Sequence, residues 1–357
     1  MTQVNRVDGG SLLNRKKVIN FTFNGKKLKG YKGDTLASAL LANGISIVGR
    51  SFKYGRPRGI MSAGVEEPNA ILQVGATPDT EVPNIRATQQ EIYEGLVCRT
   101  VNGWPSVDID IMSLVGKVAG HLMPPGFYYK TLMFPQFLWH TYEKVVRLAA
   151  GLGSAPREPD PDHYDKLNHH CDVLIIGAGP AGLAAALAAA EGSARVIILD
   201  ENPVAGGHLR YSRDTIEGLP ALEWIDQTVA QLVASDNIEL LLRTTAIGLH
   251  DHNFVAAVER KTDHLGEAAP ARLARQRLHR IHAEQIILAT GAQERPLVFA
   301  NNDVPGCMQA SAVSAYIHNY GVRPGKNLVV MTNNNSAYSG SCAYLRVYDL
   351  QRNRIPA

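Results

Sequence analysis

Closely spaced cysteines are missing from this sequence of 357 residues. Its four cysteines, Cys98, Cys171, Cys307 and Cys342, lie far apart and form no CxxC pair. This spacing argues against a disulfide framework, a zinc knuckle and a dithiol redox centre, and it suits a reducing compartment. The first residues, MTQVNRVDGGSLLNRKK, lack the apolar core of a secretory signal. We therefore expect a cytoplasmic protein.

Strong charge and long apolar runs are also lacking. The formal net charge is +3, whereas a surface that tracks nucleic-acid phosphates normally makes a domain strongly basic. The aromatic-rich segment 104–161 is interrupted by Lys117, His121, Pro124 and other residues, so it falls short of the roughly 18 apolar residues of a membrane span. We expect no nucleic-acid partner and no membrane span, and we expect this arm to pack on its own protein or on a partner. An interfacial helix is the alternative.

The first pattern is that of a small α+β domain. Residues 18–44 read as a strand, an Asn24-Gly25 turn, a second strand and a helix. Asn-Gly suits a type I′ hairpin because both turn positions need positive φ. Asp34 can cap the helix, and Gly44 can close it in the left-handed conformation. Further strands in 70–74 and 94–101 would complete a ferredoxin-like or ubiquitin-like (β-grasp) domain over 15–103, after a tail of residues 1–14.

The second pattern begins at Cys171, after an arm and linker over 104–170. CDVLIIGAGPAGLAAALAAAEGSARVIILDEN is a buried strand, a glycine turn, a helix and a second buried strand that ends in acids. Gly177 permits the tight turn, Gly179 lets the backbone approach a pyrophosphate, and Gly182 lets the helix pack closely. Helix amides would bind the phosphates, and Asp200 or Glu201 would accept ribose hydroxyls. This pattern predicts a Rossmann-like FAD/NAD(P)-binding α/β domain over 171–338, with NADP disfavoured by the acid.

Other residues extend or limit this site. A further buried strand, 281–288, ends before Thr290 and Gly291, which could border the same cofactor because ligands lie at the carboxyl ends of strands. Residues 238–285 alternate well enough for an antiparallel meander. His169, His170 and Cys171 lack partners at ligand spacing, so we predict no metal site. No nucleophile with a recognisable base emerges, and we assign no catalytic residue.

Several longer strings carry a resemblance to a known family. They include IVGRSFKYGRPRGI at 47–60, EEPNAILQVG at 66–75, GFYYKTLMFP at 126–135 and ATGAQERPLVFANNDVPGCM at 289–308. Together with the glycine motif they closely resemble the alpha subunit of heterotetrameric sarcosine oxidase, and its opine and proline dehydrogenase relatives, over about residues 15–338. The resemblance implies an oxidoreductase subunit acting on the CH–NH bond of a small amine, assembled with a beta subunit that carries flavin.

The resemblance also implies a set of nucleotide-binding positions and tilts the cofactor to NAD over FAD. Carried over residue by residue, the site comprises Gly177, Gly179, Pro180, Ala181, Gly182, Asp200, Glu201, Gly207, Thr290 and Gly291.

The sequence departs from the family pattern in three places. The loop ANGISIVGRSFKYGRPRG contains no cysteine, whereas a [2Fe–2S] cluster needs four, so we predict no iron–sulfur cluster. Its basic residues Arg50, Lys53, Arg56 and Arg58 would contact an anion or partner, or be solvated. Residues 339–357 resemble nothing expected after KNLVVMTNNNSAY and read as a frame-shifted tail. We also expect no returning strand, which would leave an incomplete dinucleotide domain with an exposed sheet edge.

Two rival functions stay open. One is a stand-alone FAD-dependent pyridine nucleotide oxidoreductase, which bound flavin would support. The other is a non-catalytic remnant or assembly subunit, which the unusual tail favours.

Overall fold

The computed structural model describes residues 3–111, 113–114 and 134–338, and these form two compact units. One unit combines the described residues up to Pro161 with those from Arg295 onward, and the other is Asp162–Glu294. The segment after Arg295 thus groups with the amino-terminal unit, although its sequence follows the dinucleotide motif. The predicted domain bounds divide the chain by motif and stay a prediction.

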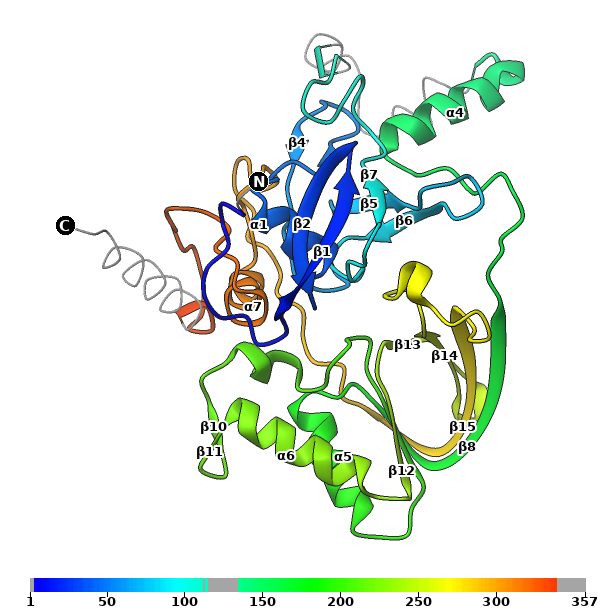
Figure 1. Ribbon diagram of the computed structural model, residues 1–357, viewed down its shortest axis with the longest axis vertical. Coiled ribbons are helices and arrows are strands. Elements are labelled where there is room, and N and C mark those ends of the chain that lie inside the picture. The colour runs from blue at the N-terminus through cyan, green and yellow to red at the C-terminus, as the bar shows by residue number, and fades with distance from the viewer. Residues whose placement is uncertain (1–2, 112, 115–133, 339–357) are drawn as a thin grey trace, which may run out of the picture. The chain divides into compact units, whose positions relative to one another are not determined.

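A five-stranded sheet organises the amino-terminal unit (Figure 1). Its strand order is β2-β1-β7-β5-β6, in which β1 and β7 are parallel. Every residue of helix α1, Leu36–Ala42, is buried in the core of this unit. The strands are β1 Asn14–Phe23, β2 Lys26–Lys32, β5 Ile71–Val74, β6 Val82–Arg86 and β7 Val97–Arg99, and a short β3–β4 hairpin pairs Gly49–Arg50 with Pro57–Arg58. A helix packed on a mixed sheet confirms the predicted ferredoxin-like domain.

Local sequence signals account for the first hairpin and helix. Asn24 and Gly25 have φ values of 48° and 76°, as the predicted type I′ turn requires. Gly44, with φ of 79°, follows the helix end in the left-handed conformation. The predicted cap at Asp34 is wrong, because Thr35 caps the helix and its hydroxyl accepts from the amide of Ser38 at 3.2 Å.

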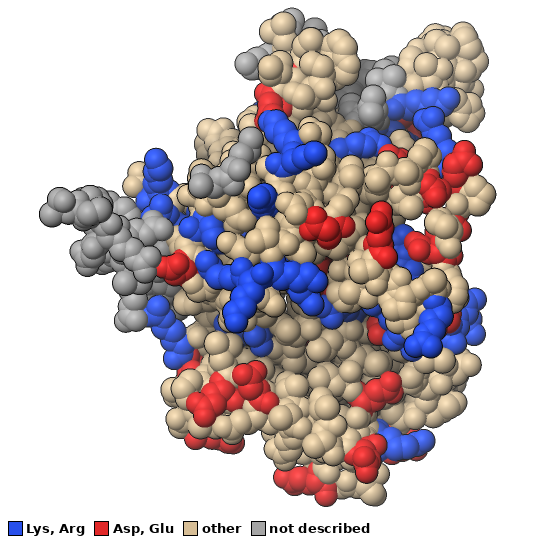
Figure 2. Space-filling model, viewed as in Figure 1, with Lys and Arg blue, Asp and Glu red and all other residues tan. Residues whose placement is uncertain are grey.

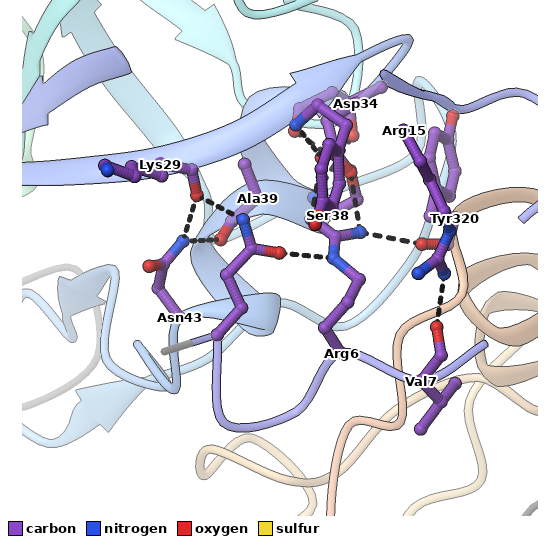
Figure 3. Close-up of polar contacts among 12 residues, drawn as sticks. Arg6, Val7, Arg15, Lys29, Asp34, Ser38, Ala39, Asn43 and Tyr320 are labelled. Carbon is purple, nitrogen blue, oxygen red and sulfur yellow. Dashed lines mark hydrogen bonds and ion pairs between the residues drawn. The ribbon is translucent and has the colours of Figure 1, made fainter. Parts of the chain in front are cut away.

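Asp34 instead forms a buried ion pair (Figure 3). Its oxygens accept from the Arg6 guanidinium at 2.7 and 3.1 Å, and Arg6 also donates to the carbonyl of Tyr320 at 2.7 Å. Tyr320 is the last residue of helix α7, Ala310–Tyr320. Arg6 therefore ties the amino-terminal segment to α7.

Helix α7 contributes directly to the core of the amino-terminal unit. Ala312, Tyr316 and Tyr320 pack in the same buried cluster as α1 and β1. The hydroxyl of Tyr316 donates to the carbonyl of Ser62 at 2.7 Å. These contacts join parts of the chain about 250 residues apart, which sequence periodicity cannot reveal.

The Asp162–Glu294 unit is built on a six-stranded sheet of order β12-β9-β8-β15-β14-β13. The first four strands are parallel neighbours and the last two are antiparallel. The strands are β8 Tyr164–Ile176, β9 Val196–Leu199, β12 Ile238–Leu241, β13 Thr244–His250, β14 Phe254–Arg260 and β15 Gln276–Leu288. The predicted meander is found in β13, β14 and β15, whereas β12 lies at the opposite edge of the sheet.

Helices α5, Pro180–Ala190, and α6, Ala221–Val233, cover one face of the parallel strands. Ile175 and Ile198 point into that layer, whereas Leu174 and Leu199 pack with Val255 and Ile281 on the other face. Strand β9 and the last residues of β8 are therefore buried on both faces, which explains their continuous apolar runs. This arrangement confirms the predicted Rossmann-like domain.

The last residues of β15 are paired on one side only, among the residues that the structure describes. The pairing with β14 ends at His282, and within the described residues Ala283–Leu288 is paired only with β8. Leu288 is 63% exposed there. The exposed edge that the sequence analysis expects from a missing return strand stays a prediction.

Charges of both signs are interspersed on the face shown in Figure 2, in keeping with the small net charge. Among the described helices, none is long and apolar enough to cross a membrane.

Candidate functional site

The glycine turn after β8 has a separate steric requirement at each glycine. Gly177 has φ of 107°, and a Cβ placed on it would lie 2.3 Å from the carbonyl oxygen of Ala289. A Cβ on Gly182 would lie 1.8 Å from the carbonyl oxygen of Gly177. Side chains are thus excluded at both positions by neighbouring backbone.

Gly179 differs from the other two. A Cβ built on it meets nothing within 4 Å, and the residue is the N-cap of α5 with φ of −73°. Nothing in the fold itself therefore demands glycine at this position. An open backbone at a helix N-terminus is the surface that a pyrophosphate approaches.

Helix α5 begins in the manner of an anion-binding helix. Pro180 is its first residue, where a missing N–H costs no intrahelical bond. Ala181 and Gly182 follow in the first turn, whose amide groups have no partner within the helix. The helix dipole adds partial positive charge at this end.

Asp200 follows β9 and reaches back to the turn. Its Oδ2 accepts from the amide of Ala178 at 2.8 Å, and its Oδ1 accepts from the Asn202 amide at 2.8 Å and from Asn202 Nδ2 at 2.9 Å. The residue is 8% exposed. Glu201, the next residue, is half-buried, and its carbonyl accepts from Arg260 Nη2 at 2.7 Å.

A second glycine pair packs against the turn. The amide of Gly206 donates to the carbonyl of Ala178 at 2.8 Å. A Cβ on Gly207 would lie 3.1 Å from the Cα of Gly179, and Gly207 has φ of 51°. Gly207 is among the positions predicted from the sequence and Ala178 is not, because Ala178 makes its contacts through its backbone and its side chain gives no signal.

Thr290 and Gly291 lie at the same edge because β15 runs parallel to β8. The amide of Ala289 donates to the carbonyl of Ile176 at 2.8 Å, so the chain leaves β15 beside the glycine turn. Thr290 and Gly291 are exposed. The structure thus gathers the ten predicted positions at one edge of the sheet, and their role in binding stays a prediction.

The buried cysteines are held as thiols. Burial raises the pKa of Cys98 to about 12. Burial, and then the neighbouring Asp172 carboxylate, raises the pKa of Cys171 to about 11. A nucleophilic thiolate at either residue is disfavoured.

The basic loop of residues 47–60 is largely engaged within its own unit. Arg56 and Arg58 both pair with Asp303, the latter at 2.7 Å. The Arg50 guanidinium donates to the carbonyls of Gly55, Val107 and Asp108. Three of the four basic residues therefore hold the loop in place.

His169, two residues before Cys171, is part of a row of polar side chains across the sheet. His169 Nε2 lies 2.9 Å from His279 Nδ1, and His279 Nε2 lies 3.2 Å from Glu259 Oε2. Burial lowers the pKa of His169. The Glu239 carboxylate raises this pKa, whereas the His279 charge lowers it further. Within the part of the chain that the structure describes, no group of three His, Cys, Asp or Glu residues could hold a metal ion.

Two family models match the chain. Residues 16–103 match the 2Fe-2S iron-sulfur cluster binding domain, and residues 171–331 match the pyridine nucleotide-disulphide oxidoreductase family. With the fold and the glycine turn, these matches support a ferredoxin-like domain followed by a Rossmann-like domain that is similar to the pyridine nucleotide-disulphide oxidoreductases.

The particular resemblance is to sarcosine oxidase. The chain is 50% identical to the sarcosine oxidase alpha subunit of Rhizobium meliloti (strain 1021), over 94% of this chain and 34% of that protein. It is 42% identical to that of Corynebacterium sp. (strain P-1), over 91% of this chain and 29% of the relative. The chain corresponds to the amino-terminal part of these subunits and spans about a third of their length, which confirms the predicted resemblance.

A solved structure supports the fold. L-proline dehydrogenase from P. horikoshii matches with a TM-score of 0.63 and 21% identity, over 97% of this chain and 54% of that chain.

The match of residues 16–103 to the cluster-binding family contradicts our prediction about cofactors, which excluded an iron–sulfur cluster. That prediction used only the missing cysteines of the loop, whereas the family is recognised over the whole domain. Cys98, the cysteine within the matched residues, is buried in β7. The described residues offer no cysteine ligand set, so no electron-transfer step through a cluster follows from them.

Proposed function

We propose that the chain is the dinucleotide-binding amino-terminal part of a sarcosine-oxidase-like flavoprotein that oxidises a secondary amine together with a partner beta subunit. The single observation that carries the proposal is the turn at Gly177–Gly182. Backbone contacts explain Gly177 and Gly182, whereas Gly179 is open at a helix N-terminus. The fold alone does not require glycine at position 179, whereas the close approach of a pyrophosphate does.

The residues around the turn have separate tasks in this proposal. Gly179, Pro180, Ala181 and Gly182 present the helix N-terminus to the pyrophosphate, and Gly207 borders it. Asp200 and Glu201 lie at the ribose side, and Thr290 and Gly291 flank the opposite side. FAD or NAD, when bound, supplies a ring that accepts a hydride. The chain's own residues bind and orient the dinucleotide, and no residue is assigned to proton transfer.

The partner is proposed from the relatives, which are named as alpha subunits. The amine would be bound and oxidised by the partner's flavin site. Size-exclusion chromatography of the chain with and without a co-expressed beta subunit tests assembly. A stable complex supports the subunit proposal, and two separately eluting chains contradict it.

Isothermal titration of the purified chain with FAD and with NAD tests the site directly. Gly179→Val is the informative variant, because a Cβ at this position meets no protein atom within 4 Å and the added side chain would occupy the phosphate approach. We expect saturable binding of one dinucleotide, lost in Gly179→Val and retained in Gly192→Ala, whose added Cβ meets only distant atoms at 3.9 and 4.0 Å. Absence of binding from folded protein contradicts the proposal.

Retained flavin is read in the same preparation by an absorbance scan. Flavin that copurifies with the chain alone, followed by NADH-dependent reduction, would instead favour a stand-alone oxidoreductase.

A further inference from the structure

The β1–β2 hairpin concentrates positive charge. Between Asn14 and Gly33 the sequence has no acidic residue. The formal net charge of the whole chain is only +3, so the rest of the chain is net acidic. The hairpin is therefore a local basic surface, and all of its lysines are exposed. Its cations are Arg15, Lys16, Lys17, Lys26, Lys27, Lys29 and Lys32.

The two strands have one buried face and one exposed face. Phe21 and Leu28 are buried in the core of the unit. Because side chains alternate along a strand, the residues on either side of them project from the opposite face. The register sets Lys29 across from Asn20 and Lys27 across from Thr22. We call these four residues, Asn20, Thr22, Lys27 and Lys29, the outward face of the hairpin.

A shallow hollow of about 400 Å³ lies on the outward face and is bordered by Glu94. The Glu94 carboxylate is fixed there, because it accepts from the amide and from Nδ2 of Asn20, both at 2.9 Å. These hydrogen bonds lower the pKa of Glu94, so the carboxylate is charged at neutral pH. The hollow thus sets two lysines beside one fixed anion.

Protection of the sheet edge explains only part of the positive charge. Strand β2 is an edge strand, and lysines on an edge discourage pairing with another chain. The middle of this edge is already covered, because the Lys29 carbonyl accepts from Gln3 Nε2 and from Asn43 Nδ2, both at 2.8 Å (Figure 3). Among the described residues, Lys27 and Lys29 form no ion pair. Their charge is therefore available to a partner.

We propose that the outward face of the hairpin binds an extended acidic segment of a partner protein. Lys27 and Lys29 are two residues apart on one strand, a spacing of about 7 Å. This spacing matches carboxylates on alternate residues of an extended segment. The fixed charge of Glu94 disfavours the continuous phosphates of a nucleic acid or a lipid surface, because it repels the phosphates nearest to it. The proposal does not depend on the dinucleotide site.

The test is a fluorescence anisotropy titration of the full chain with a labelled peptide of alternating Glu and Ala. Lys27→Gln combined with Lys29→Gln removes the proposed contacts from exposed positions. Lys166→Gln combined with Lys326→Gln is the matched control, since it removes two exposed lysines outside the hairpin. An oligodeoxythymidine and phosphatidylserine vesicles are titrated in parallel.

We expect saturable binding of the peptide that weakens with added salt, because exposed charges are screened. The affinity should fall about tenfold in the hairpin variant, as for the loss of two exposed ion pairs, and by less than about twofold in the control. Equal losses in the two variants would mean that the peptide responds only to overall charge and would overturn the proposal. Absence of peptide binding at low salt would do the same. Tighter binding of the oligonucleotide or the vesicles, lost in the hairpin variant, would assign the surface to that other class of partner.

Discussion

Substitution by alanine should have different effects on stability at Gly182 and at Gly179, two glycines of the turn after β8. In Gly182→Ala the new Cβ would collide with the carbonyl oxygen of Gly177, so we expect a loss of about 1–3 kcal/mol or more in unfolding free energy. Gly179→Ala meets no atom and should change stability by less than about 0.5 kcal/mol. Chemical denaturation of both variants measures the difference.

Equal stability of the two variants would contradict the close packing of α5 on β8. The control is Gly192→Ala, which adds a methyl group after α5 without a close contact.

The buried thiols predict a pH dependence of reactivity and stability. The pKa of Cys98 is raised from 9.0 to about 12 by burial, so the folded state keeps its proton where the unfolded state loses it. Its contribution to stability is therefore complete below pH 9 and declines as pH rises from about 9 toward 12. At pH 8 we expect iodoacetamide to spare Cys98 and Cys171 in native protein and to label both after unfolding, as read by peptide mass spectrometry.

Rapid native labelling of Cys98 would show that β7 is not buried as described. Cys307, which is partly exposed, serves as the internal comparison.

The contacts of Arg6 join the amino-terminal segment to α7, so its removal should lower stability. Its side chain is 6% exposed and that of Asp34 is fully buried, so Arg6→Ala leaves a buried carboxylate without its cation. Such a break typically costs about 3–5 kcal/mol. We expect Arg6→Ala to lower the unfolding free energy by this amount, measured by urea denaturation followed by circular dichroism.

Lys26→Ala is the matched control for a surface pair. Lys26 and Asp108 are 59% and 60% exposed, and such pairs contribute at most about 1 kcal/mol. Similar losses in the two variants would mean that Arg6 does not hold α7 to the amino-terminal segment.

Elements defined by local chemistry could be predicted from the sequence. The Asn24-Gly25 hairpin and the turn at Gly177 need positive φ, and both positions carry residues suited to it. The role of Asp34 could not be predicted, because its partner Arg6 lies 28 residues away. Asp200 shows the same limit, since the amide it binds is 22 residues distant. Motif spacing placed Asp200 near the turn but did not reveal its hydrogen bond to the Ala178 amide.

At the scale of the whole molecule, the two units predict two unfolding transitions by calorimetry. Gly182→Ala should lower the transition of the Asp162–Glu294 unit, and Arg6→Ala that of the other unit, because each contact lies within one unit. Saturating dinucleotide should raise the first transition, since a ligand stabilises the state it binds. A single transition that all three perturbations shift equally would contradict independent units.

The sequence could not predict that α7 belongs to the amino-terminal unit. As with Asp34, the residues that it contacts are distant in sequence. Its apolar residues are compatible with any nearby core, and only the folded chain shows that Tyr316 fills a space beside α1. The iron–sulfur prediction failed differently. It judged a domain by a few ligand positions, whereas the family match draws on all of residues 16–103.

Hydrogen–deuterium exchange of the full chain, with and without FAD or NAD at saturation, tests whether the dinucleotide binds at the glycine turn. We expect added protection in peptides that cover Gly177–Leu183, Asp200–Gly207 and Thr290–Gly291, and no such change in Gly179→Val. Saturable binding with protection confined to other segments would contradict the assignment of the dinucleotide to this turn.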